Sequence, residues 1–253
     1  MGRLGYAARG TIYLMTGFSA ALAAIRPEHR ARGLTESLRP LQHHWAGGLV
    51  LLALASGLAC LAGWLAVAAL SRRDHTGPAR YVFAAGTLGD AAVYFGFMAS
   101  VVGIVIGAGP GGGDHELQSW AAWLMAHTYG RVLLGMAGAI VAGCGVGLVG
   151  WAAFGDIEGP MALSRAEKRL VRPIGRYGIG GRGAAIALIG GCLIAAAIHG
   201  NPREAHELGG LLDALRAHSY GIAAMALFAL AFVASSLFDF MIAVFRRFDP
   251  ADP

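Results

Sequence analysis

The sequence predicts an all-α, multi-pass membrane protein assembled from three tandem two-helix repeats. Of its 253 residues, 56% are hydrophobic and only 14% are charged, with a mean hydropathy of +0.57. Soluble domains carry about 25% charged residues, so this composition favours a lipid environment. The repeat is marked by the spacing L-x6-L-x2-H-x2-G, which occurs three times: Leu34, Leu41, His44 and Gly47; Leu117, Leu124, His127 and Gly130; Leu208, Leu215, His218 and Gly221.

Six apolar segments reach the ~20-residue length that a membrane span needs. They cover residues 9–25, 45–70, 82–108, 129–154, 176–198 and 220–245. Paired in order, they define repeats 1–75, 76–160 and 170–248 within one membrane domain. Two-helix units that repeat in the same direction are related by an axis along the membrane normal, as in some transporters. We therefore expect six transmembrane helices in a pseudo-threefold arrangement.

The first segment of each repeat carries glycines around one charged position. Gly5, Arg9, Gly10 and Gly17 in repeat one match Gly178, Arg182, Gly183 and Gly190 in repeat three. Repeat two keeps Gly89 and Gly96 but has Leu88 in place of the arginine. Because small residues let helices approach closely in lipid, these glycines indicate helix packing.

The run G-Y-A-A-R-G-T-I-Y from Gly5 to Tyr13, with the two-helix repeat over almost the whole chain, resembles the bacterial "domain of unknown function 1206" membrane family. The copy in repeat three, G-I-G-G-R-G from Gly178, is partial, and the copy in repeat two is degenerate. The resemblance implies six helices in a bacterial membrane. It implies no activity, so function is inferred from the residues themselves.

Positive charge is distributed unequally between two sets of loops. The N-terminus, loops 71–81 and 155–182 and the C-terminus hold 13 of the 20 lysines and arginines. The positive-inside rule therefore predicts cytoplasmic termini in a bacterial inner membrane. Loops 26–44, 109–128 and 199–219 then face outward, where leucines seven residues apart predict three short surface helices. An interfacial aromatic belt is expected there from Trp45, Trp120, Trp123, Tyr129 and Tyr220.

Histidines gather on the predicted outer side. Eight of the nine lie there: His29, His43, His44, His115, His127, His199, His206 and His218. His44, His127 and His218 share one repeat position, so a threefold bundle would bring them to the same depth. Three imidazoles at the outer mouth would bind a divalent metal such as zinc or copper, or respond to pH. The alternative is three interfacial residues copied by duplication, with no further role.

Four charged residues lie at membrane depth: Arg9, Asp90, Arg182 and Asp239. An isolated charge in lipid costs at least about 3 kcal/mol, so such residues normally pair or face water. Arg182 and Asp239 stand at nearly the same depth on neighbouring antiparallel helices, which predicts that their side chains approach within salt-bridge or one-water distance. Arg9 and Asp90 are further candidates for structural ion pairs, and a proton or ion pathway through these residues is the alternative.

The sequence contains no Gly-x-Ser-x-Gly, Walker or HExxH pattern, and it assigns no enzymatic activity. The leading interpretation is a non-enzymatic inner-membrane accessory subunit or small binding module with a histidine-rich outer face. One alternative is a transporter or channel for protons, metal ions or a small solute. Another is a haem- or copper-holding subunit of a redox complex. Expected partners are the bilayer and other membrane subunits or further copies of the chain, not nucleic acid, and a divalent metal is the candidate cofactor.

The topology is testable by cysteine labelling. With the termini in the cytoplasm, a cysteine introduced by Glu167→Cys resists an impermeant thiol reagent added outside intact cells, because the basic loop 155–182 lies inside. Glu28→Cys, in a loop that faces outward, reacts and serves as the control. Ready labelling after Glu167→Cys would invert the predicted orientation.

Overall fold

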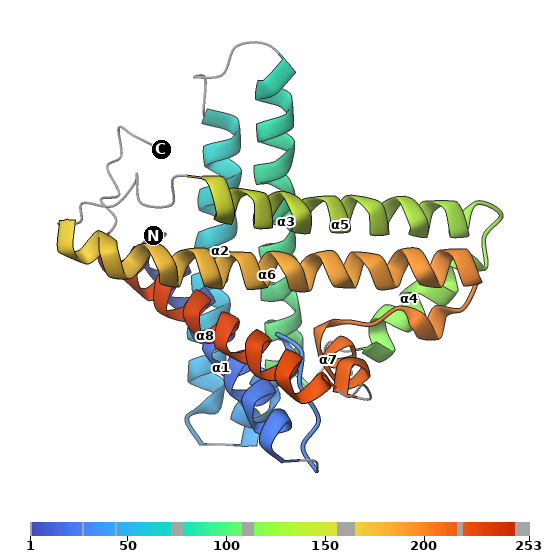
Figure 1. Ribbon diagram of the computed structural model, residues 1–253, viewed down its shortest axis with the longest axis horizontal. Helices are drawn as coiled ribbons and strands as arrows, with labels where there is room; N and C mark the ends of the chain where they lie inside the picture. Colours follow the sequence, from blue (N-terminus) through green and yellow to red (C-terminus); the bar gives the residue numbers. More distant parts are fainter. Residues whose placement is uncertain are drawn as a thin grey trace.

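The computed structural model describes residues 2–26, 28–43, 45–71, 78–107, 114–155, 165–216 and 220–245. These residues form helices joined by short connections, with no strand among them (Figure 1). The long helices are α1 (Gly2–Ile25), α2 (Gly47–Ser71), α3 (Pro78–Val105), α5 (Gly130–Phe154), α6 (Arg165–His199) and α8 (Gly221–Phe245). The short elements are η1 (Glu36–His43), α4 (Asp114–Met125), η2 (Pro202–Glu204) and α7 (Leu208–Arg216), where η denotes a 3₁₀ helix.

The long helices coincide with the six predicted apolar segments, but three begin earlier, among them α3, which begins at Pro78 rather than residue 82. α1 begins at Gly2 rather than residue 9, and α6 begins at Arg165 rather than residue 176. The α6 extension is rich in arginine and lysine, and the α1 extension holds Arg3 and two alanines; these residue types favour helix without forming an apolar run. A search for apolar runs therefore finds the membrane core of each helix and misses its polar end.

Four of these helices are long and apolar enough to cross a membrane: α2, α5, α6 and α8, over Gly47–Val67, Gly130–Phe154, Val171–His199 and Gly221–Val244. The all-α, multi-pass membrane character is thus confirmed. Six spans are not confirmed in the described residues. Over the residues whose side chains are described, α3 contributes an apolar stretch from Gly89 to Val105, and α1 carries Arg3 and Arg9.

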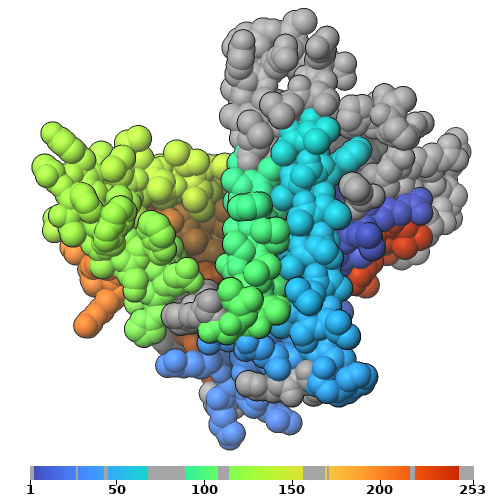
Figure 2. Space-filling model, turned by 180° about the vertical axis from the view of Figure 1, so that it is seen from behind, coloured from blue at the N-terminus to red at the C-terminus, as the bar shows by residue number. Residues whose placement is uncertain are grey.

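The helices pack in the spatial order α5, α6, α8, α1, α2, α3. A closed pseudo-threefold ring would also require α3 against α5, and within the described residues these two helices do not pack along one another. In Figure 1, α2 and α3 run steeply across α5 and α6, while α1 and α8 lie obliquely between the two pairs. Figure 2 shows α2 and α3 side by side, with α4 and α5 extending away from them. The pseudo-threefold arrangement is therefore not confirmed.

Glycines hold α5 and α6 at backbone contact. A Cβ atom at Gly183 of α6 would lie 2.8 Å from the carbonyl oxygen of Gly145 on α5, and one at Gly190 would lie 2.7 Å from that of Gly138. Real Cβ atoms essentially never come this close to backbone. The two glycines on each helix are seven residues, or about two turns, apart and so share one face.

The contact between α1 and α8 repeats that arrangement. Gly10 and Gly17 of α1 face the carbonyl oxygens of Ser236 and Ala229, at 3.3 and 3.0 Å from a Cβ placed on each glycine. Ser236 is the fifteenth residue after the glycine that opens α8, as Gly145 is after the glycine that opens α5. The two contacts thus use equivalent positions in the repeat, and α1 packs on the last helix of the chain.

Repeat two departs from this arrangement. Gly89 and Gly96 of α3, the counterparts of Gly10 and Gly17, meet no atom within 4 Å of an added Cβ. The tenth residue after the glycine that opens each even helix also differs. It is Gly57 in α2 and Ala231 in α8, and both pack on the odd helix of their own repeat. In α5 it is Ile140. A bulky residue at this position disfavours close approach of α5 to α3, and Ile140 is exposed.

The short helices η1, α4 and α7 occupy the three predicted surface positions. Leu38 of η1 and Leu212 of α7 are fully buried, so these elements pack onto the bundle. Polar contacts link the repeats here: Asp114 of α4 accepts a 2.6 Å hydrogen bond from the Glu207 backbone N–H, and Asp213 of α7 accepts one of 3.2 Å from Ala31. The five aromatic side chains of the predicted belt are all exposed.

The glycine contact between α5 and α6 predicts opposite outcomes for two matched substitutions. Gly145→Ala places a methyl group 2.6 Å from the Gly183 carbonyl oxygen, and overpacking of this kind costs about 1–3 kcal/mol. Gly143→Ala enters open space and gains about 0.5–1 kcal/mol from helix propensity. Thermal unfolding in detergent should show a lower Tm for the first variant only, and equal values would argue against this contact.

Candidate functional site

The proposed histidine ring has one member within the described residues. His44 and His218 lie outside them, whereas His127 is exposed at the end of α4. Its Nδ1 lies 3.0 Å from the carbonyl oxygen of Trp123, and its ring lies 4.8 Å from that indole. Within the described chain, no three histidine, cysteine or acidic residues are grouped as metal ligands would be. A metal site at these histidines stays a prediction.

Two other outer histidines pair with single carboxylates. His199 Nδ1 lies 2.6 Å from Glu204 Oε2, and His206 Nδ1 lies 3.2 Å from Asp114 Oδ2. The hydrogen bond from His199 stabilises the ionised form of Glu204 and holds the pKa of that carboxyl below its ordinary value. These contacts tie the η2 connection and α4 to the outer ends of their neighbours.

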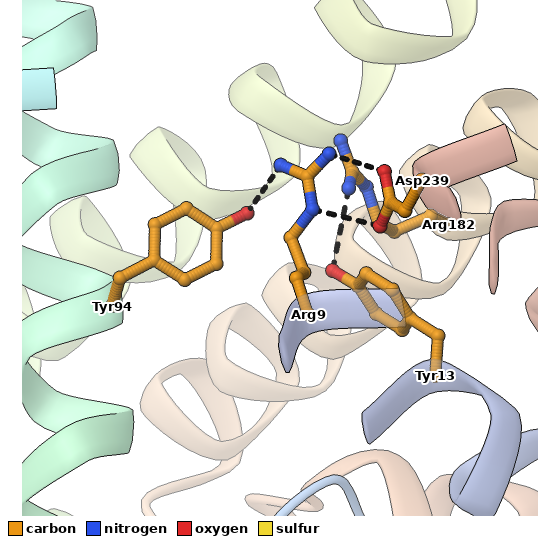
Figure 3. Close-up of polar contacts among 5 residues, drawn as sticks. All are labelled: Arg9, Tyr13, Tyr94, Arg182 and Asp239. Atoms are coloured by element: carbon orange, nitrogen blue, oxygen red, sulfur yellow. Dashed lines mark hydrogen bonds and ion pairs between the residues drawn. The ribbon is translucent and has the colours of Figure 1, made fainter. Parts of the chain in front are cut away.

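The main polar feature inside the bundle is a group of five residues, the central cluster: Arg9, Tyr13, Tyr94, Arg182 and Asp239 (Figure 3). Arg9 donates two hydrogen bonds to the Asp239 carboxylate: Nε donates to Oδ2 at 2.8 Å and Nη2 donates to Oδ1. Its Nη1 donates to the Tyr94 hydroxyl at 3.0 Å. The Asp239 side chain is 3% exposed and that of Arg9 13%, so this is a largely buried, bidentate ion pair.

Arg182 lies in the same cluster with fewer contacts. Its Nη1 donates to the Tyr13 hydroxyl at 3.3 Å, and its guanidinium stands 5.5 Å from the centre of that ring. It interacts electrostatically with Asp239, but no hydrogen bond joins the two among the described residues. The hydrogen-bonded partner of Asp239 is Arg9, and the approach of Arg182 to within one-water distance of Asp239 stays a prediction.

The preference of Asp239 for Arg9 has a structural cause. α8 packs against both α1 and α6, and both of these helices carry an arginine at the same repeat position. Depth along the helix cannot choose between them. Gly10 brings α1 within 3.4 Å of Asp239 Cβ, measured from an added Cβ, so Arg9 reaches the carboxylate directly.

Asp90 makes no hydrogen bond or ion pair within the described residues. It lies on α3, one helical turn before Tyr94, and its side chain is exposed. It interacts electrostatically with both Arg182 and Arg9. Asp90 is thus an electrostatic neighbour of the central cluster.

Aromatic rings and hydroxyls that the sequence did not single out complete the site. The guanidinium of Arg9 also stands 4.8 Å from the centre of the Tyr6 ring, a distance suited to a cation–π interaction. Ser235 and Ser236 are buried beside Asp239 on α8, and neither Oγ has a hydrogen-bond partner in the described part of the chain. Tyr6 lies three residues before Arg9 and Tyr13 four after it, a helical spacing visible in the motif from Gly5 to Tyr13.

The central cluster contains two arginines and one carboxylate. Arginine stays protonated under all ordinary conditions, so these three side chains sum to one positive charge when Asp239 is ionised. Asp90 offsets part of this excess, because it interacts electrostatically with both arginines, and the remaining positive charge attracts an anion more strongly inside a low-dielectric bundle than it would in water. The arrangement is suited to holding a negatively charged group.

The Arg9–Asp239 pair predicts a large difference between two aspartate substitutions. Asp239→Asn leaves Arg9 buried without its counter-charge, which costs about 3–5 kcal/mol, whereas Asp90→Asn, at an exposed position, changes stability by less than about 0.5 kcal/mol. Thermal unfolding of the purified variants checks both values. The double variant Arg9→Met with Asp239→Leu should recover most of the loss, and an Asp239→Asn protein as stable as wild type would contradict a buried ion pair.

Comparison with known proteins agrees with this architecture. The sequence model of the family described as "Domain of Unknown Function (DUF1206)" matches three segments, residues 4–72, 85–155 and 177–246. The chain is 25% identical over 258 residues to the "Uncharacterized protein YxxB" of Bacillus subtilis (strain 168), covering 97% of this chain and 90% of that protein. No solved structure matches significantly. With each of its three repeats matched by the same family, the chain belongs to the DUF1206 family.

Proposed function

We propose that the protein is a non-enzymatic inner-membrane binding module, either on its own or as an accessory subunit, and that its binding element is the central cluster. All six long helices cross the membrane in this proposal, with both termini in the cytoplasm. The outer histidines have a secondary role, because those among the described residues contact nearby carboxylates or a carbonyl oxygen rather than one another.

One observation carries the proposal: Arg182 lies within a membrane helix bundle without a carboxylate hydrogen-bonded to it in the described chain. A charge at membrane depth is costly and usually marks a functional position. A purely structural role would be expected to give each arginine its own carboxylate, as Arg9 has. Arg182 instead keeps hydrogen-bonding capacity that a bound molecule can use.

A proton or small-solute pathway is the second candidate, favoured by polar groups on either side of the central cluster. Toward the outer face, the Thr16 and Ser37 hydroxyls lie 3.3 Å apart in a buried contact. Toward the cytoplasmic end of α6, Arg176 Nε is buried with no hydrogen-bond partner among the described residues. These groups would form the two ends of a path through Tyr13, Arg182 and Asp239.

The proposal is tested by asking what stays bound after gentle purification. Native mass spectrometry and metal analysis are applied to the wild type, to Arg182→Gln and to Arg203→Gln, which alters an exposed outer arginine. We expect a small molecule in the wild type and in Arg203→Gln, and its loss from Arg182→Gln. The same retained molecules in all three proteins, or none in any, would refute a binding role for the cluster. Proton flux into vesicles that disappears in Asp239→Asn would instead support the pathway.

A further inference from the structure

The three repeats differ at one pair of equivalent positions. Asp239 is the eighteenth residue after the glycine that opens α8; the eighteenth residue is Leu148 in α5 and Leu65 in α2. The corresponding odd-helix positions are Arg9, Arg182 and Leu88. Each even helix is paired with the odd helix of the next repeat, and the last repeat is paired with the first. This gives Asp239 with Arg9, Leu148 with Arg182, and Leu65 with Leu88. Only the second combination leaves an arginine without a carboxylate.

The backbone packing supports this equivalence. A Cβ added at Gly10, next to Arg9, would meet the Ser236 carbonyl oxygen and the Phe240 ring. A Cβ added at Gly183, next to Arg182, would meet the Gly145 carbonyl oxygen and Val149. Gly145 and Val149 occupy the repeat positions of Ser236 and Phe240. Leu148 therefore stands on α5 where Asp239 stands on α8, beside an arginine that has kept its place.

The two arginines also differ in their use of donors. Arg9 donates from Nε, Nη1 and Nη2. Arg182, with the same five N–H groups, makes one hydrogen bond among the described residues, to Tyr13. Nearby, Ser235 is 3% exposed and packs on Gly178, one turn before Arg182, with its hydroxyl lacking a partner in the described chain.

We propose that Arg182 binds a small monocarboxylate anion, which supplies the carboxylate that Leu148 does not. This inference rests on the proposed binding function and names its ligand class. A carboxylate accepts two parallel hydrogen bonds from guanidinium, the geometry that Asp239 already adopts on Arg9. A single negative charge balances the excess charge of the central cluster. Asp90 interacts electrostatically with Arg182 and so opposes the binding of an anion there.

Acetate is the probe for this site. Titrated into the full-length protein in detergent, it should raise Tm by about 5–10 °C once its concentration exceeds Kd about a hundredfold. Arg182→Gln weakens acetate binding about 10- to 100-fold, the value of one or two charge-assisted hydrogen bonds. Asp90→Asn strengthens binding, because a like charge is removed. An equal Tm shift with chloride at matched ionic strength would refute a carboxylate site.

A second variant keeps the test valid if Arg182→Gln does not fold. Leu148→Asp supplies an internal carboxylate, so the protein should stay folded and lose its response to acetate. In an Arg182→Met background, the same change should lower Tm by about 10 °C, because the new carboxylate has no partner. Leu65→Asp is the control and should destabilise in either background. Equal destabilisation of both backgrounds by Leu148→Asp, or a retained acetate response, would overturn the proposal.

Lipid phosphate shares this oxyanion chemistry, and nanodiscs separate the two sources. We expect the acetate response in phosphatidylcholine and in phosphatidylglycerol nanodiscs alike. Loss of the response only in phosphatidylglycerol would assign the site to a lipid headgroup and overturn a free carboxylate ligand. A different molecule retained through Arg182 would leave the binding function intact while refuting this ligand class.

Discussion

The ion pair between Arg9 and Asp239 joins the first helix of the chain to the last. It lies largely buried between α1 and α8, with a tyrosine hydroxyl as a third partner of the arginine. Without that pair, an arginine in the middle of α1 would oppose insertion of the helix into lipid. With it, the charge of Arg9 is neutralised inside the protein, which favours placing α1 in the bundle although α1 is not among the four helices that are long and apolar enough to cross a membrane.

This pair depends in turn on how closely the helices approach. Gly10 and Gly17 let α1 lie at backbone distance from α8, which sets Arg9 directly against Asp239. The same glycine pair on α6 brings that helix against α5, where Leu148 occupies the repeat position that Asp239 has on α8. In lipid, where the hydrophobic effect does not drive helices together, such contacts depend on packing of small residues and on polar pairs. The α1–α8 and α5–α6 contacts thus share the same glycine packing but differ in the charged residues beside it.

Much of this arrangement can be predicted from local sequence. Apolar length predicts the helices, the fixed spacing before Gly47, Gly130 and Gly221 predicts the repeat, and the glycines predict where helices touch. What sequence could not supply is the choice among equivalent partners. Arg9 and Arg182 sit at the same depth, and only the packing of α8 between α1 and α6 shows which one meets Asp239. The rotation of α3, which leaves Gly89 and Gly96 facing open space, is equally non-local.

Divergence between duplicated units is where function is most readily gained. Duplicated units begin with the same residues at each helix contact. Losing one member of a buried ion pair is then costly unless the other member is lost too or finds a new partner. Repeat two took the first course, with leucine at both Leu88 and Leu65. Repeat three has Arg182 with Leu148 at the equivalent position, and no carboxylate is hydrogen-bonded to this arginine among the described residues. A half-buried arginine with unused hydrogen-bond donors is the ground on which we propose a partner from outside the chain.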